Sequence, residues 1–415
     1  MVHRSLDPGS SPVILRNPQL TGYSLSRIFA LMKRIYLDHT ATTPVDPRVL
    51  DAMLPYFSET FGNASSVHWY GQQAKVVLEQ ARETIARSIG AESGEVFFTS
   101  GGTESDNFAI KGVAAVAGPK GKRHIVTTRV EHHAVLEPCE HLAREGFEVT
   151  YLPVDGHALV SPGLISESLT ASVCLVSIMY ANNEVGTIYP IQEIASVAHR
   201  HGVFVHTDAV QALGRVPLDV RTLGVDLMTI SAHKIYGPKG IGALYVKRGT
   251  ELDPLLQGGG QERGKRPGTE NVPLAVGFAK AVELAVAEMD TEPRRLKSLR
   301  DDLEARIAAE IPYALVNGHP TSRLPHILNI SMDSGRVLLE GEMLLMNMDL
   351  KGIAVTSGSA CTSGSMQPSH VLLAMGRDPR TAKATLRFAF GKSNTKEDID
   401  YVVESLKSVV RHMTR

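Results

Sequence analysis

Residues 203–234 read VFVHTDAVQALGRVPLDVRTLGVDLMTISAHK and contain two apolar runs, at 203–207 and 227–231. Short apolar runs of this kind are typical of buried strands. Asp208 follows the first run directly, and Lys234 follows the second, 26 positions further along (234 − 208). This spacing leaves room for a crossover between two parallel strands, and such sheets bind ligands at the carboxyl ends of their strands. The stretch therefore predicts an α/β fold with a carboxylate and a lysine at one sheet edge.

The same alternation of strands and helices extends on both sides of this stretch. Helical periodicity separates most of the apolar runs, which predicts βαβ units around a largely parallel sheet. Residues 241–246, which follow the turn at 237–240, fit an antiparallel return strand. The other predicted strands are 95–99, 124–128, 147–152 and 173–179, and the clearest helices are 78–89, 133–146 and 191–201.

Beyond about residue 270 the pattern changes to that of a smaller α+β domain joined by a long helix. The last predicted helix has a capping box, because Asp398 follows Thr395 three residues later, before a periodic apolar run. The predicted helices are 273–289, 293–310, 338–350 and 395–413, and the predicted strands are 327–331 and 385–390.

The composition excludes several classes of protein. The chain has 415 residues, 43 Lys+Arg against 44 Asp+Glu, a formal net charge of −1, and 43% hydrophobic residues. The apolar fraction predicts a packed core, and the balanced charge argues against a nucleic-acid surface. No apolar run approaches the roughly 20 residues of a membrane helix. Three cysteines cannot build a disulfide framework, so we expect a soluble cytoplasmic protein; a mitochondrial location is less favoured.

Residues 1–31 differ from the rest of the chain because they show no sustained periodicity. Arg4, Arg16 and Arg27 give them a composition that only faintly resembles a transit peptide. Ordered-looking sequence begins with MKRIYLDHTATTP at Met32. We therefore interpret residues 1–31 as a poorly ordered or non-native N-terminal extension.

Three features at the predicted strand ends carry chemistry. Lys234, before a Gly/Pro-rich turn, is well placed to form a Schiff base with an aldehyde cofactor, although most lysines are solvated surface charges. Asp208 suits a pyridinium nitrogen that must stay protonated, and its alternative role is to cap a helix from Ala209. Residues 100–103, Ser-Gly-Gly-Thr, open a helix whose amides suit a phosphate, the alternative being a plain tight turn.

The three cysteines occupy different contexts. Cys174 lies in an apolar run and is expected to be a buried core thiol, and Cys139 falls in a predicted helix, where it packs or is inert. Cys361 lies in the small, polar segment SGSACTSGS at 357–365, which offers nothing to pack against. Since a free thiol on an exposed segment oxidises readily, its retention suggests a use.

Nine blocks in order along the chain resemble the pyridoxal-phosphate-dependent cysteine desulfurases of the NifS/IscS type, within the class V aminotransferases of fold type I. The resemblance runs from about Ile35 to the C-terminus, and the segment around Cys361 is similar to that of the long-loop group. The blocks are YLDHTATTP (36–44), TSGGTESDN (99–107), EHHAVL (131–136), NNEVG (182–186), HTDAVQ (206–211), SAHKIYGPKGIGALYV (231–246), GGGQERGKRPGT (258–269), SGSACTSGS (357–365) and TLRFAFG (385–391).

The resemblance implies a fold of two domains. The large, cofactor-binding domain would span 47–292 and contain a mixed, mostly parallel seven-stranded sheet. The small α+β domain would be built from 32–46 and 293–415 and would carry the catalytic cysteine loop at about 355–367. A homodimer is also implied, because Thr269 resembles the residue that reaches the phosphate from the partner subunit.

The resemblance further implies a role for each site residue. Lys234 would bind the cofactor aldehyde covalently and move protons, and Cys361 would be the nucleophile. His132 would stack on the ring and assist proton transfer, with His133 a bystander. Arg387 and Asn183 would fix the substrate, Arg387 as a fork on its carboxylate. The cofactor-binding set would be Gly102, Thr103, His132, Asn183, Asp208 (pyridine nitrogen), Gln211 (phenolic oxygen), Ser231, His233, Lys234 and Thr269.

The implied activity is conversion of L-cysteine to L-alanine through a persulfide on Cys361. The sulfur would pass to an acceptor protein, such as an iron–sulfur scaffold, or to thio-cofactor or tRNA thiolation. No metal is expected, since the histidines lack metal-site spacing. Direct nucleic-acid contact and membrane contact are not expected either. The alternatives are a selenocysteine lyase, another class V aminotransferase, or a non-catalytic scaffold that retains the fold.

Overall fold

The computed structural model describes residues 33–358 and 367–414. The predicted N-terminal extension falls outside the described residues, and so does Cys361. The described residues from Ile35 onward form one compact unit.

The centre of this unit is a sheet of seven strands in the order β2-β8-β7-β6-β5-β3-β4. β8 is antiparallel to both of its neighbours, and the other pairs are parallel. The prediction of an α/β fold with a mixed, mostly parallel seven-stranded sheet is therefore confirmed, including the antiparallel return strand. The strands are β2 (Val96–Thr99), β3 (His124–Thr128), β4 (Glu148–Leu152), β5 (Val173–Ser177), β6 (Phe204–Asp208), β7 (Leu227–Ser231) and β8 (Gly242–Val246).

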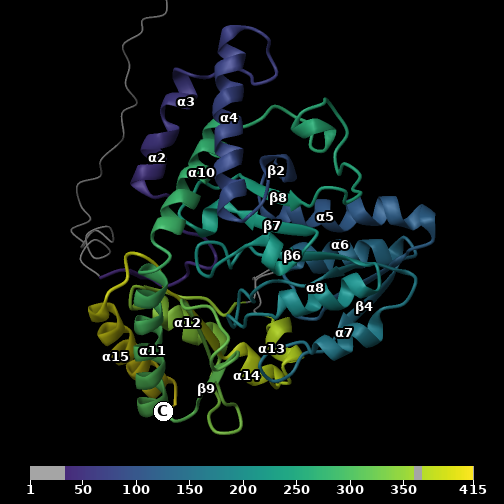
Figure 1. Ribbon diagram of the computed structural model, residues 1–415. Helices are drawn as coiled ribbons and strands as arrows, with labels where there is room; N and C mark the ends of the chain where they lie inside the picture. The colour runs from purple at the N-terminus through teal and green to yellow at the C-terminus, as the bar shows by residue number, and fades with distance from the viewer. Residues whose placement is uncertain (1–32, 359–366, 415) are drawn as a thin grey trace, which may run out of the picture. The chain divides into compact units, whose positions relative to one another are not determined.

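Helices cover both faces of this sheet, because successive side chains of a strand point to opposite sides. Phe97 of β2 packs in a core with side chains of α5 and α6. Phe98, the next residue, packs in the core that includes α4, α8 and α10. Figure 1 shows α4 and α10 side by side against the sheet. These helices are α4 (Trp69–Ser88), α5 (Gly102–Ala117), α6 (His133–Arg144), α8 (Ile191–Arg200) and α10 (Val272–Ala287).

A second hydrophobic core surrounds a three-stranded antiparallel sheet of order β12-β10-β9. Leu37, beside the N-terminal strand β1, shares this core with Phe388 of β12, and β1 pairs in parallel with β11. The predicted domain limits at 46–47 and 292–293 stay predictions. The elements are β1 (Ile35–Tyr36), α11 (Glu292–Glu310), β9 (Ala314–Asn317), β10 (Ile327–Met332), α12 (Gly341–Leu350), β11 (Ile353–Ala354), β12 (Thr385–Ala389) and α15 (Lys396–Met413).

The ends of several elements follow local side-chain chemistry. The capping box at the start of α15 is confirmed, since the Thr395 N–H donates to Asp398 Oδ2 at 3.2 Å. α4 begins at Trp69 with His68 as its N-cap. No helix begins at Ala209, but Asp208 Oδ1 accepts from the Val210 N–H at 2.9 Å, so Asp208 caps the hydrogen-bonded turn that follows it. Shorter elements are α2 (Pro47–Met53), α3 (Pro55–Ser58), α7 (Pro162–Ser168), α9 (Val220–Leu223), α13 (His370–Ala374), α14 (Pro379–Lys383), η1 (Ser93–Glu95), η2 (Gly118–Lys120), η3 (Ala232–Lys234) and η4 (Glu262–Gly264).

Two of the three cysteines belong to the core, as predicted. Cys139 and Cys174 are buried free thiols, and burial raises the pKa of Cys139 to about 12 and that of Cys174 to about 11. Both thiols therefore stay protonated and unreactive near neutral pH. Separately, none of the helices in the described part of the chain is long and apolar enough to cross a membrane.

Candidate active site

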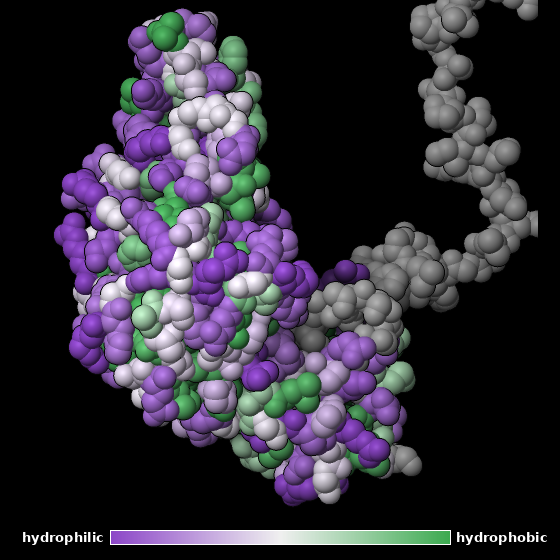
Figure 2. Space-filling model, turned by 90° about the vertical axis from the view of Figure 1, so that its right-hand side faces the viewer, coloured by the Kyte–Doolittle hydropathy of each residue, from purple (hydrophilic) through white to green (hydrophobic). Residues whose placement is uncertain are grey.

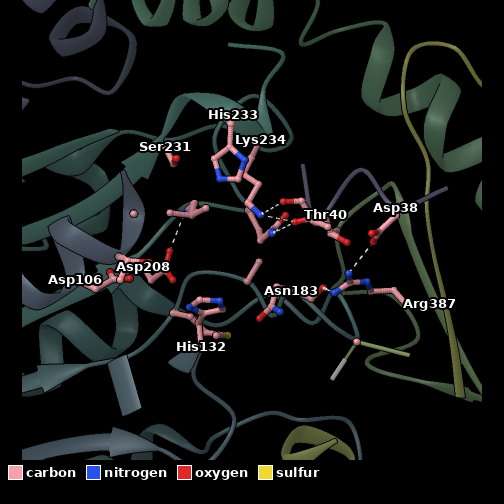
Figure 3. A pocket seen from close by; sticks show the side chains of 18 of the residues that line it. Asp38, Thr40, Asp106, His132, Asn183, Asp208, Ser231, His233, Lys234 and Arg387 are labelled. Carbon is pink, nitrogen blue, oxygen red and sulfur yellow. Dashed lines mark hydrogen bonds and ion pairs between the residues drawn. The ribbon is translucent and has the colours of Figure 1, made fainter. Parts of the chain in front are cut away.

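The carboxyl ends of the parallel strands surround a cavity of about 350 Å³ (Figure 3). Asp208 ends β6 and Ser231 ends β7, while His132 follows β3 and Asn183 follows β5. Parallel strands present their carboxyl ends on one side, so residues distant in the sequence converge there. The volume is within the range of pockets that hold small molecules.

Lys234 lines the cavity from the end of η3, directly after β7. Its Nζ donates hydrogen bonds to the carbonyl oxygens of Thr40 at 2.6 Å and Ala41 at 2.7 Å. Burial lowers the pKa of Lys234 to about 8, and the nearby Arg387 guanidinium lowers it too, against the opposing effect of carboxylates in the cavity. A buried amine that loses its proton near neutral pH is suited to attack an aldehyde.

Two carboxyl groups lie together at the inner end of the cavity, as Figure 3 shows. Asp208 Oδ1 accepts from the Val210 N–H at 2.9 Å, and burial raises the pKa of Asp208, while Lys234 lowers it. Burial, together with the neighbouring Asp208 carboxylate, raises the pKa of Asp106 well above its usual range. His206 supplies no cation for this pair, because burial lowers its pKa to about 3. We infer that Asp106 carries a proton and that Asp208 is the carboxylate of the site.

Hydrogen-bond donors on one side of the cavity form an anion site. α5 begins at Gly102, and the first N–H groups of a helix have no acceptor within the helix. A Cβ on Gly102 would lie only 2.9 Å from Val210 Cγ2, so a larger residue here would require Val210 to shift. Ser231 Oγ is buried without a partner among the described residues, and Thr103 and His233 also line the cavity. Such a cluster at a helix N-terminus suits a phosphate.

His132 lines the cavity as a neutral ring. It is the N-cap of α6, where its Nδ1 accepts from the Ala134 N–H at 3.1 Å. Burial lowers the pKa of His132 to about 4, and Lys234 contributes in the same direction. Since Nδ1 accepts a hydrogen bond, the proton of the neutral ring lies on Nε2. The adjacent His133 has a side chain that is 60% exposed and does not line the cavity.

Arg387 lies across the cavity from Asp208 (Figure 3). Its Nη1 donates to the Asn183 carbonyl oxygen, and its Nη2 donates to Asp38 Oδ1, both at 2.9 Å. The side chain of Arg387 is only 6% exposed, so its charge is weakly screened by water. The cavity thus has a phosphate-type site at one end and a carboxylate-type site at the other.

The structure brings together almost all of the residues predicted from the sequence. Every predicted cofactor- or substrate-binding residue except Thr269 lines this cavity. Thr269 is exposed and lines a separate cavity of about 160 Å³, together with Arg266 and Asn271. The predicted nucleophile Cys361 lies outside the described residues, although Gly358, three residues before it, lines the cavity. The individual roles of these residues stay predictions.

Several residues of the cavity were not predicted individually. Asp38, Thr40 and Ala41 come from the N-terminal segment, and Asp106 comes from the first turns of α5. All four lie inside the YLDHTATTP and TSGGTESDN blocks, so their motif membership was the available signal. Their contact with Lys234, Arg387 and Asp208 depends on tertiary structure.

Among residues 33–358 and 367–414, no group of three or more His, Cys, Asp or Glu side chains could hold a metal ion.

Comparison with known proteins identifies the class of protein to which this fold and cavity belong. The family described as "Aminotransferase class-V" matches residues 35–402, and the chain belongs to that family.

Closely similar relatives narrow the class further. A protein of Dictyoglomus turgidum named "Cysteine desulfurase IscS" is 49% identical over 383 residues, which cover 92% of this chain and 96% of the relative. A protein of the same name from Methanosarcina thermophila is 49% identical over 381 residues, covering 92% and 93%. A solved structure titled "NIFS-LIKE PROTEIN" aligns with a TM-score of 0.85 at 38% identity, covering 92% of this chain and 100% of that one. Within the class V family, the chain belongs to the cysteine desulfurases of the IscS/NifS type.

Proposed function

We propose that the chain converts L-cysteine to L-alanine and transfers the sulfur to its own Cys361 as a persulfide. The observation that carries this proposal is the arrangement of one cavity. Asp208 comes from the end of β6 and Lys234 from the end of the adjacent strand β7, and both lie beside the anion site of α5. These groups match the aldehyde, the ring nitrogen and the phosphate of pyridoxal 5'-phosphate. The 49%-identical relatives named cysteine desulfurase support the same activity.

The donors of the cavity fit pyridoxal phosphate chemically. Gly102, Thr103 and the unpartnered Ser231 hydroxyl would hold the phosphate. Asp208 would keep the ring nitrogen protonated, and Gln211, whose Nε2 donates to the Thr40 carbonyl at 3.1 Å, would bond the phenolic oxygen. Once bound, the cofactor supplies an electron sink that allows bonds at the substrate carbons to break.

The side chains around the substrate position would hold it and move its protons. Arg387 binds the substrate carboxylate, and the cavity residue Asn183 helps to orient it. Lys234 Nζ, as a neutral amine no longer bonded to the cofactor, would accept the proton of the substrate Cα. The neutral ring of His132 carries its proton on Nε2, where it can assist this transfer.

Cys361 would carry out the sulfur transfer. Its thiolate attacks the sulfur of the substrate, so that an S–S bond forms as the C–S bond breaks. The electron pair of the C–S bond remains with the substrate carbon, which takes up a proton and becomes the methyl group of L-alanine. The persulfide sulfur is then available to an acceptor protein of iron–sulfur cluster assembly, or to thio-cofactor or tRNA thiolation.

The first test of this function is a product balance. Full-length protein loaded with pyridoxal phosphate is incubated with L-cysteine and an excess of a thiol reductant, and L-alanine and sulfide are both quantified. We expect equal amounts of the two products. Alanine from L-selenocysteine alone would favour a selenocysteine lyase, and amino-group transfer without sulfide would favour another class V aminotransferase.

The lowered pKa of Lys234 predicts the pH dependence of cofactor capture. Only the deprotonated amine attacks an aldehyde, so the rate at which cofactor-free protein captures pyridoxal phosphate should rise with pH and level off above about 8. Stopped-flow absorbance across a pH series measures this rate. A rate that keeps rising toward about pH 10, as for an ordinary lysine, would contradict the prediction. Arg387→Gln removes a cation that lowers the pKa, so its midpoint should move to higher pH.

We also propose that the protein is a homodimer with shared sites. Large apolar side chains are exposed on α3 and around the start of α4: Phe57 is 58% exposed, Phe61 63%, Trp69 63% and Tyr70 49%. In Figure 2 the upper end of the view, where Figure 1 places α3 and α4, shows separate hydrophobic residues among hydrophilic ones. Exposed apolar surface of this kind marks an interaction site. A second copy is the proposed occupant, because Thr269, predicted to reach a phosphate site, does not line the cavity of its own chain.

We further propose that the protein works in the cytoplasm. The two described cysteines are both free thiols, which is usual in a reducing compartment. The bacterial and archaeal relatives named above support this placement.

A further inference from the structure

Asp38 lines the cavity and has no role in the proposed function so far. Its Oδ1 accepts from Arg387 Nη2 at 2.9 Å, and Figure 3 shows the two side chains joined at one end of the cavity. The side chain of Asp38 is 22% exposed and that of Arg387 is 6% exposed. The pair is therefore largely removed from water. Because water screens charges and the protein interior screens them less, the two charges act strongly on each other and on a nearby ligand.

The main chain fixes the position of this carboxylate. Asp38 forms a parallel bridge with Ala389, which lies two residues beyond Arg387 on β12. The Ala389 N–H donates to the Leu37 carbonyl oxygen at 2.7 Å, and the Tyr36 hydroxyl donates to the Asp38 carbonyl oxygen at 3.0 Å. The backbone hydrogen bonds between residues 37–39 and β12 hold Asp38 beside Arg387. We therefore expect Asp38 to keep this position when a ligand enters.

Arg387 retains donors for a ligand despite these contacts. Nη1 donates to the Asn183 carbonyl oxygen and Nη2 donates to Asp38, but each of these nitrogens carries two N–H groups. One N–H on each nitrogen therefore remains for a substrate carboxylate. A carboxylate bound there shares the guanidinium with Asp38.

Only one cation of the cavity remains for a ligand. Lys234 would be bonded to the cofactor in the loaded protein, so Arg387 is the remaining lysine or arginine among the described lining residues, with the Asp38 carboxylate beside it. A ligand with one carboxylate finds the donors of Arg387. A second carboxylate on the same ligand finds no further cation among the described lining residues and is repelled by Asp38.

We propose that Asp38 is a specificity-determining residue, whose fixed negative charge beside Arg387 restricts the site to ligands with a single carboxylate. This inference rests on the proposed function, in which Arg387 binds the carboxylate of the substrate. The negative charge of Asp38 excludes ligands with two carboxylates by repulsion, which is a common basis of specificity in binding sites. Amino acids with an acidic side chain would be rejected, whereas those with a neutral side chain would be accepted.

The test measures binding without any chemistry. Propionate has one carboxylate and succinate has two, and neither has an amine or a thiol that could react. Their affinities for the full-length, cofactor-loaded protein are measured by isothermal titration calorimetry near pH 8. In Asp38→Asn, which keeps an oxygen acceptor for Arg387, propionate should gain about threefold in affinity. Succinate should gain about tenfold. It carries two negative charges, the Coulomb energy of repulsion by Asp38 scales with the ligand charge, and a threefold factor for each charge multiplies to about tenfold.

The controls separate charge from structure. Asp38→Glu keeps the charge and should retain the wild-type preference for propionate. Asp400→Asn removes an exposed carboxylate that pairs with Arg306 outside the cavity, and it should change neither affinity. Equal factors for the two ligands in Asp38→Asn, or no change in either, would overturn the assignment of Asp38. If Arg387→Gln leaves the propionate affinity unchanged, the carboxylate site in the proposed function is wrong instead.

Discussion

Replacement of Lys234 by alanine is expected to lower the rate of L-alanine formation from L-cysteine by at least about 1,000-fold. The variant loses both the amine that bonds to the cofactor aldehyde and the group that moves the proton of the substrate Cα. In the structure this amine donates to two carbonyl oxygens, at 2.6 and 2.7 Å, inside the cavity. No other lysine lines the cavity among the described residues, so nothing there replaces it.

A readout independent of turnover makes this prediction sharper. Borohydride reduction of the loaded wild-type protein, followed by peptide mass spectrometry, should show the cofactor attached at Lys234, and the alanine variant should show no attachment. Lys239→Ala is the matched control, because Lys239 lies in the turn after η3 but is exposed and does not line the cavity. Cofactor attachment that persists in Lys234→Ala at another residue would refute the role of Lys234.

The central sheet was predictable from the sequence because its signals are local. The strand at His124–Thr128 and the strand at Leu227–Ser231 match the predicted ranges, since each is a short apolar run between helical or turn segments. The antiparallel β8 followed from the turn at 237–240, which is too short for a crossover helix. By contrast, β9 (Ala314–Asn317) was missed, because it has only four residues and most of them are partly exposed.

The cavity was predictable to the extent that strand ends determine it. Asp208 follows a buried strand, and a parallel sheet collects such residues at one edge. Asp38 could not be found in this way, because β1 has only two residues and its partner β11 lies more than 300 residues away in the sequence, at Ile353–Ala354. Asp106 was missed for a related reason, since its proximity to Asp208 requires α5 to pack against the sheet.

The proposed sulfur chemistry depends on Cys361, the cysteine that lies outside the described residues. The chain has three cysteines, and burial keeps two of them, Cys139 and Cys174, protonated. Gly358, at one side of the segment that contains Cys361, lines the cavity. At the other side, the Ser369 hydroxyl donates to the buried Glu184 carboxylate at 2.5 Å. Gly358 and Ser369 therefore both lie against Glu184, the residue that follows the cavity residue Asn183.

Replacement of Cys361 by serine is accordingly expected to remove persulfide formation and to lower sulfide release from L-cysteine by at least about 1,000-fold. A thiolate is a strong nucleophile toward sulfur, whereas a hydroxyl stays protonated near neutral pH and cannot form a persulfide. Lys234 and the anion site are unchanged, so the variant should still bind pyridoxal phosphate with the absorption of the wild-type protein. Cys174→Ser is the matched control: its thiol is buried, with a 3.3 Å hydrogen bond to the His124 carbonyl oxygen, and persulfide per folded chain should be unaffected. The measurement is persulfide detection by mass spectrometry after a single addition of L-cysteine. Equal amounts of persulfide in Cys361→Ser and in the wild-type protein would show that another residue is the nucleophile.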